Sequence, residues 1–151
     1  MKNLKQITTY WYEAKTKIFE IYFTDEQGLK QGVSKWYDTN GALREEGNWK
    51  NNSRHGVFKW YYLNGNVECE VNYKNDERHG VRKWYDTNGN VWYEGNCKNN
   101  KKHGVYKEYD TNGILRVEAN FKNDERHGAF KWYDENGNVV FEEYYKNDEI
   151  N

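Results

Sequence analysis

Apolar and polar side chains alternate along most of this chain in short runs that end at Asn, Gly or Asp. Residues 57–62 and 67–73 illustrate the pattern, because every second position in each run is apolar. A period of two is typical of a half-buried β-strand rather than of a helix. We therefore expect an all-β protein whose sheet has one apolar face and one solvated face.

The predicted strands belong to a repeat of 24 residues that runs without a gap from Gln31. The repeats are 31–54, 55–78, 79–102, 103–126 and 127–150. Residues 7–30 form a degenerate copy, with Ala14 to Lys17 in place of the turn, and we expect this hairpin to cap the array. The prediction is a single repeat domain over residues 1–151, folded as an elongated single-layer antiparallel meander of about six β-hairpins.

Each repeat carries an Asn-Gly pair between two strand-like runs. These pairs are Asn40-Gly41, Asn64-Gly65, Asn88-Gly89, Asn112-Gly113 and Asn136-Gly137. A two-residue turn in which both residues adopt positive φ would place Lys59 opposite Glu70 and Tyr61 opposite Glu68. The same register pairs Lys with Glu in all five repeats, which favours it. A bulged turn would instead move one strand's side chains to the other face.

Composition narrows the class of protein. The 23 basic and 24 acidic residues give a net charge of −1, so no general field attracts nucleic acid or supports contact with an anionic membrane. Aromatic residues make up 18% of the chain and supply the burial that folding requires. No run approaches the roughly 20 apolar residues that span a bilayer, and no secretory signal or disulfide framework is evident. We expect a soluble cytoplasmic protein.

Residues with the potential for chemistry are few. Four histidines precede a glycine at the same repeat position and are expected to shape loops. Successive histidines should lie two strands apart, about 9.5 Å, which is too far for them to share a metal ion. They are His55, His79, His103 and His127. The Asp of each Asp-Thr-Asn-Gly segment lacks the later carboxylates of a calcium loop and is expected to be a turn acceptor. Cys69 and Cys97 are expected to be small core residues. We expect no catalytic residues, metal or cofactor, and a protein that is not an enzyme.

Several of the recurring segments resemble the MORN repeat, and more closely its bacterial variant, which includes the YwqK antitoxin family. The resemblance covers residues 31–150 and is carried by Trp84-Tyr85, Asn88-Gly89, Tyr93-Glu94-Gly95-Asn96, Lys98-Asn99 and His103-Gly104. Val71, Ala119 and Glu143 depart from the family's usual Gly. The resemblance implies a β-hairpin repeat and a role as a scaffold, a partner-binding module, a membrane-associated module or an immunity protein.

A second resemblance leaves another function open. Residues 59–65 are similar to part of a choline-binding cell-wall repeat, which is also an aromatic hairpin. That resemblance implies glycan binding by the aromatic face. The 24-residue period and the His-Gly step favour the MORN variant.

Position 14 of the repeat differs most between copies and is the candidate binding position. In the two-residue register it lies opposite a recurring tyrosine, and rows of Tyr beside Arg and Trp are typical of interface hot spots. The candidate partner-binding residues are Arg44, Tyr61, Glu68, Tyr85, Trp92, Tyr109, Arg116, Tyr133 and Val140. The alternative is a solvated sheet face with cross-strand Tyr packing. Glu108 interrupts a column of Trp and either lines a polar pocket or marks an exposed rim.

The sequence therefore favours a non-enzymatic protein that binds another protein. By resemblance, this role is that of a bacterial antitoxin or immunity protein with a toxin domain as its partner. A scaffold or membrane-associated module is the alternative, and glycan binding is the third. Exposed edge strands also predict weak association between copies.

Overall fold

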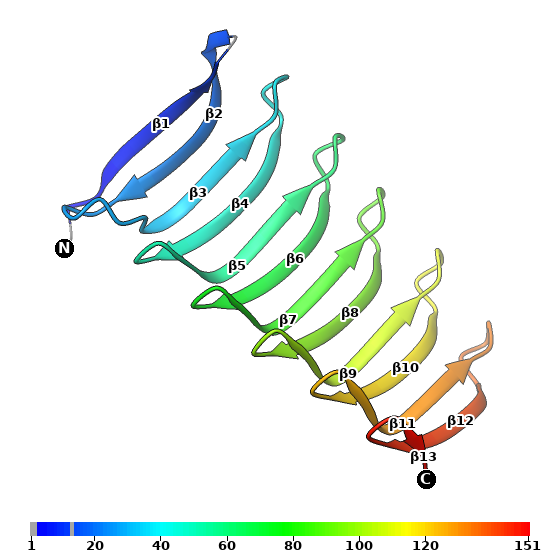
Figure 1. Cartoon of the computed structure of the whole chain (residues 1–151). Helices are drawn as coiled ribbons and strands as arrows, with labels where there is room; N and C mark the ends of the chain where they lie inside the picture. The colour runs from blue at the N-terminus through cyan, green and yellow to red at the C-terminus, as the bar shows by residue number, and fades with distance from the viewer. Residues whose placement is uncertain (1–2, 13) are drawn as a thin grey trace. The chain divides into compact units, whose positions relative to one another are not determined.

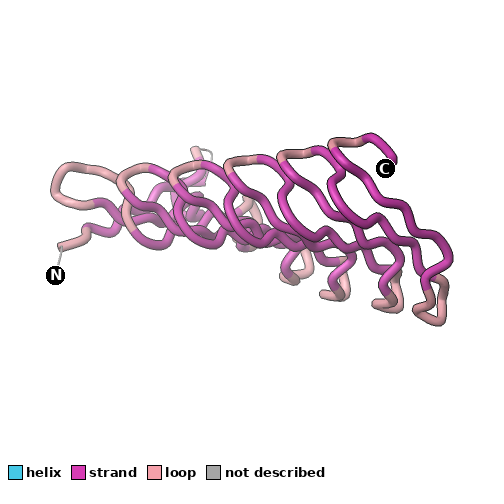
Figure 2. The backbone as a smooth tube through the Cα atoms, turned by 90° about the horizontal axis from the view of Figure 1, so that it is seen from below, coloured by secondary structure: helices cyan, strands magenta, loops and turns pink. Residues whose placement is uncertain are grey.

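The computed structural model describes residues 3–12 and 14–151, and these residues form strands and turns without a helix (Figures 1 and 2). The strands are β1 (Lys5–Trp11), β2 (Ala14–Thr24), β3 (Gly32–Tyr37), β4 (Leu43–Lys50), β5 (Ser53–Tyr61), β6 (Val67–Lys74), β7 (Glu77–Tyr85), β8 (Val91–Lys98), β9 (Lys101–Tyr109), β10 (Leu115–Lys122), β11 (Glu125–Tyr133), β12 (Val139–Lys146) and β13 (Glu149–Ile150). The chain divides into two compact units, residues 1–77 and 78–151.

Within each unit, strands that are adjacent in the chain pair antiparallel. In the first unit β1 to β6 follow one another in this way, and in the second unit β7 to β13 do the same. The prediction of an all-β antiparallel hairpin repeat is therefore confirmed. The residues that stand in place of the Asn-Gly turn in the degenerate copy begin β2, because Ala14 already pairs with Trp11.

The Asn-Gly turns contain three residues rather than two. In the hairpin of β5 and β6 the Tyr62 N–H donates to the Asn66 carbonyl at 2.9 Å, and the Gly65 N–H donates to the Tyr62 carbonyl at 3.0 Å. Gly65 adopts a φ of 87°, which glycine reaches at little cost. This arrangement is a tight turn followed by a left-handed glycine, and it corrects the expectation that both residues of the pair have positive φ.

A bulge on the second strand then restores the expected register. Tyr61 pairs with Val67 next to the turn, whereas Trp60 pairs with Cys69, so Glu68 is an extra residue without a counterpart. The longer turn shifts the register by one residue and the bulge shifts it back. The predicted Lys–Glu pairs are consequently correct, and the predicted pairing of Tyr61 with Glu68 is wrong.

The two-residue turns with positive φ lie at the opposite end of the hairpins. There Asn-Asn or Asn-Asp connects each repeat to the next, with φ values between 51° and 77°. These turns are Asn51-Asn52, Asn75-Asp76, Asn99-Asn100, Asn123-Asp124 and Asn147-Asp148. Since the turns are this tight, the histidines expected in loops lie within the following strands, as His55 in β5 shows.

One face of each unit, here called the charged face, carries the Lys–Glu pairs. Their Nζ–O distances are 2.8–3.7 Å. The pairs are Lys35–Glu46, Lys59–Glu70, Lys83–Glu94, Lys107–Glu118 and Lys131–Glu142. Neighbouring hairpins continue the alternation, because Glu94 also lies opposite Lys107 and Glu118 opposite Lys131. Each unit's row of charges is therefore balanced along its length.

The other face, here called the aromatic face, contains the core. In the first unit Phe58 is completely buried, and its ring lies 5.6 Å from the Trp49 ring and 5.3 Å from the Tyr73 ring. In the second unit the buried Tyr106 has the same role, with its ring 5.0 Å from that of Phe121. Edge-to-face contacts of this kind replace the second layer that a larger domain would use to bury its sheet.

Candidate binding surface

The most variable residue of each repeat is the extra residue of the bulge. In all five hairpins, the recurring tyrosine and the Trp or Glu before it are adjacent on the first strand. Their two pairing partners on the second strand are separated by one extra residue, which has no partner on the first strand. These bulge residues are Arg44, Glu68, Trp92, Arg116 and Val140. The prediction that they lie opposite the tyrosines is therefore wrong, since the tyrosines face Leu or Val instead.

The bulge places Trp92 beside the aromatic face rather than on the charged face. Its ring lies 5.7 Å from the ring of Tyr93. Tyr93 belongs to the aromatic face, because its ring lies 5.4 Å from Trp84 and 5.7 Å from Tyr106. With 45% of its surface exposed, Trp92 remains available for contact with another molecule.

Tyr109, predicted to share a surface with Trp92, lies on the charged face. Its hydroxyl donates a hydrogen bond of 2.8 Å to Oε1 of Glu94. Burial and this bond to Glu94 raise the pKa of Tyr109 to about 12. Burial opposes ionisation of Glu94 as well, but the bonds from Tyr109 and Lys83 outweigh it and lower the pKa of Glu94. In the second unit the predicted set of tyrosines and variable residues is thus divided between two faces.

In the first unit the structure brings three predicted residues together. Arg44, Tyr61 and Glu68 line one open hollow of about 350 Å³. Its walls also include Trp36 and Trp60. The bulges explain this grouping, because they place Arg44 and Glu68 next to the tryptophan positions of the repeat.

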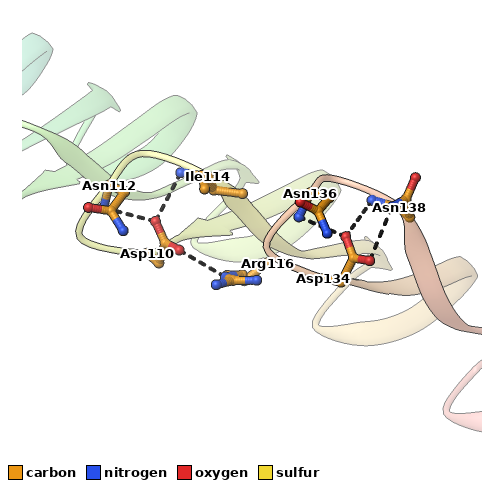
Figure 3. Close-up of polar contacts among 7 residues, drawn as sticks. All are labelled: Asp110, Asn112, Ile114, Arg116, Asp134, Asn136 and Asn138. Carbon is orange, nitrogen blue, oxygen red and sulfur yellow. Dashed lines mark hydrogen bonds and ion pairs between the residues drawn. The ribbon is translucent and has the colours of Figure 1, made fainter.

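Arg116 is held by the turn of its own hairpin. Its Nε donates to Oδ2 of Asp110 at 2.9 Å, and its side chain lies between Asp110 and Asp134 of the next turn (Figure 3). Backbone hydrogen bonds, first of all from Ile114, together with Arg116 lower the pKa of Asp110. Hydrogen bonds from Asn138 and the charge of Arg116 also lower the pKa of Asp134. Arg116 therefore has its main partner within the protein.

The expectation that the turn aspartates are acceptors is confirmed. Oδ1 of Asp110 accepts from the backbone N–H of Asn112 at 2.9 Å and of Ile114 at 3.0 Å, and Asp134 accepts from Asn136 and Asn138 in the same way (Figure 3). Each carboxylate thus bridges its three-residue turn.

Sequence reasoning missed the exposure of Trp132 at the end of the second unit. Trp132 is 50% exposed, its ring lies 5.3 Å from that of Phe141, and the predicted binding residue Val140, next to Phe141, is 63% exposed. The Trp column that Glu108 interrupts includes Trp132, and the repeat pattern gives no sign that its ring is half exposed. Three consecutive apolar residues, Val139 to Phe141, were the available signal, because a strand with one solvated face alternates. Glu108 is exposed, which agrees with a rim rather than a pocket.

The surroundings of the thiols and histidines among the described residues indicate structural roles. Burial raises the pKa of Cys69 to about 11, so this thiol is protonated near neutral pH. Cys97 is buried, and its sulfur lies 3.6 Å from the Tyr106 hydroxyl. Nδ1 of His79 lies 3.3 Å from Oδ1 of Asn99 in a connecting turn. Within residues 3–12 and 14–151 there is no group of three or more His, Cys, Asp or Glu placed to hold a metal ion.

The fold and the site define a class of β-hairpin repeat proteins, in which a recurring frame presents one variable bulge residue per repeat. A family model described as MORN repeat variant matches residues 30–51, 54–75, 78–99, 102–123 and 126–147, and the chain belongs to this family. No curated protein matches the sequence. Among the described residues, no helix is long and apolar enough to cross a membrane.

Proposed function

We propose that this protein is a non-enzymatic binding protein whose bulge residues and neighbouring aromatic side chains contact another protein. The observation that carries the proposal is the position of the variable residues. The Lys–Glu pairs and turns recur from repeat to repeat, whereas the side chain at the bulge changes from Arg to Glu, Trp and Val. A recurring frame with one changing surface position is suited to encoding a specific partner.

Exposed rings support a protein partner. Trp92 and Trp132 are half exposed, and Trp is among the residues that most often supply binding energy at protein interfaces. The charged face contributes less to recognition, because each Lys of its central row already has a Glu partner. Exposed Trp side chains can also contact sugar rings, so the experiment has to distinguish a protein partner from a glycan.

Within this class we propose the role of a bacterial antitoxin or immunity protein in the cytoplasm. This finer proposal rests on the resemblance of the repeats to the YwqK antitoxin family. Membership of the MORN repeat variant family supports a binding or scaffold role more generally. A scaffold or membrane-associated module is the alternative, and both roles use the protein's surface rather than a catalytic site.

Affinity capture with the full chain tests the proposal. The tagged protein, a Trp92→Ala variant and a Val105→Ala variant are used as baits, and captured proteins are identified by mass spectrometry. Val105 is exposed beside the charged-face residues Lys107 and Glu118 and is the matched control. One protein retained by wild type and Val105→Ala but lost from Trp92→Ala supports the proposal. Equal recovery on all three baits, or binding only to cell-wall glycan, contradicts it.

A further inference from the structure

The hollow in the first unit combines aromatic walls with an excess of acidic groups. Phe19, Trp36 and Trp60 contribute rings to its lining. The same lining contains the carboxylates of Glu20, Glu45 and Glu68 against the single guanidinium of Arg44. These groups come from β2, β3, β4, β5 and β6, so the hollow is built by the packing of the first unit rather than by one loop.

Two of the three carboxylates already have partners. Oε1 of Glu20 accepts from Nζ of Lys30 at 2.6 Å. Oε2 of Glu45 accepts from Nε1 of Trp60 at 2.8 Å, which also fixes the indole ring in the wall of the hollow. The carboxylate of Glu68 has no hydrogen bond or ion pair within the described part of the chain. One carboxylate in the hollow is therefore open to a charge from outside.

Arg44 is the one basic residue in the lining of the hollow, and its Nη1 is closed to solvent. A ligand in the open hollow therefore does not reach this nitrogen, although Nη1 has no hydrogen-bond partner among the described residues. The requirement that a ligand can meet is the one at Glu68, which favours a cation.

We infer that this hollow binds a basic side chain, Lys or Arg, of the protein partner. The inference rests on the proposed function and names the chemistry that the partner presents. A cation is attracted to the faces of Trp and Phe rings and to the unpaired Glu68 carboxylate.

An acidic side chain fits the hollow less well. A carboxylate would meet Arg44, but it would also face Glu45 and Glu68, so the acidic residues of the lining outnumber its basic one. Lys30 compensates only Glu20. A neutral side chain would pack against the aromatic walls but leave the Glu68 carboxylate unpaired. The balance of charge therefore selects a basic partner residue.

The test uses three blocked tripeptides and the full chain labelled with ¹⁵N. Glycine-flanked arginine, citrulline and glutamate peptides are titrated to about 20 mM, well above a millimolar dissociation constant, while the indole N–H signals of Trp36 and Trp60 are followed. The arginine peptide should shift both signals, citrulline much less and glutamate least. Glu68→Gln should weaken arginine binding at least about threefold, the scale of a part-exposed ion pair. Glu77→Gln, at an exposed site in the same unit, should not.

Equal binding of arginine and citrulline, preferential binding of glutamate, or an unchanged affinity for the Glu68→Gln variant would overturn the inference. The absence of any shift up to the highest concentration would also overturn it. Failure here is distinguishable from failure of the proposed function. A captured partner that is lost from Trp92→Ala but retained by Glu68→Gln would leave the function standing and refute the hollow's role.

Discussion

The ring of Phe58 lies directly against the backbone of Gly47 on the neighbouring strand. A Cβ atom at residue 47 would overlap the atoms of this ring, and Tyr106 covers Gly95 in the second unit in the same manner. Neither glycine has a positive φ, so the requirement is for space rather than for backbone conformation. The sheet thus buries its two most enclosed rings by laying them over residues without side chains.

This contact predicts that Gly47→Ala destabilises the protein by about 1–3 kcal/mol, because the methyl group forces the fully packed Phe58 ring to move. Chemical denaturation measures the change in the free energy of unfolding. Ala119 occupies the corresponding position between Tyr106 and Phe130 and is the control. Ala119→Gly should cost less than about 1 kcal/mol, the usual difference between these residues in a strand. A neutral Gly47→Ala variant would show that the ring is not fixed over residue 47.

The turns supply a second prediction. Asn123 has a φ of 56° in a two-residue connection, whereas Asn112 lies in the three-residue turn where glycine takes the positive φ. Asn123→Ala should therefore destabilise the protein by about 1–2 kcal/mol, and Asn123→Gly should be nearly neutral. Asn112→Ala should change the melting temperature much less. If Asn112→Ala is the more damaging variant, the two kinds of turn have been assigned to the wrong ends of the hairpins.

These turns show what the sequence could predict and what it could not. The alternation of side chains and the 24-residue period were sufficient for the strands, the hairpins and the Lys–Glu pairs. The turn type was not predictable, because Asn-Gly suits either a two-residue turn or a three-residue turn with a left-handed glycine. The two turn types differ by one residue in length. The bulge at Glu68 compensates for that difference, so the register is the expected one from Trp60 onward, away from the turn. Correct charge pairs therefore gave no warning that the residues nearest the turn were misplaced.

A third prediction concerns alkaline pH and Tyr109. Its pKa is raised from 10.0 to about 12 in the folded protein, so between these values the unfolded chain loses a proton that the folded chain keeps. The stabilisation from Tyr109 is fully present below pH 10 and is lost as the pH rises towards 12.

Denaturation across this range should therefore show a shallower loss of stability for Tyr109→Phe than for wild type. Tyr12→Phe, at a ring that is 96% exposed, is the control and should keep the wild-type slope. An unchanged slope for Tyr109→Phe would mean that the bond to Glu94 does not govern this titration.

The fourth prediction separates binding from stability. Trp92→Ala should weaken partner binding by at least about 2 kcal/mol, because an exposed Trp at an interface is a typical hot spot. Its effect on the melting temperature should be small, since the ring is 45% exposed. Trp84→Ala should instead cost about 3 kcal/mol of stability, because its ring packs against Tyr93 and Arg82. Calorimetric melts and binding titrations measure the two effects. If Trp92→Ala lowers the stability and Trp84→Ala weakens only partner binding, the roles assigned to the two rings are the wrong way round.

The candidate surface was only partly predictable for the same physical reason as the register. Variation between repeats identified the bulge residues, such as Trp92, because that comparison needs no three-dimensional information. The face on which they lie depends on whether a single residue is inserted, and the sequence pattern on either side is the same in both cases. The exposure of Trp132 was not predictable either, because a comparison of identical repeat positions does not distinguish it from the other Trp residues of the column.

Site-specific photo-crosslinking in living cells addresses most directly which face binds the partner. The photoreactive residue p-benzoylphenylalanine replaces either Val140 at a bulge or Val105 beside the charged face, both of which are exposed in the second unit. Irradiation followed by denaturing electrophoresis should give a discrete crosslink to one protein from position 140 and none from position 105. A crosslink to a partner from position 105 alone would contradict the assignment of binding to the bulge residues.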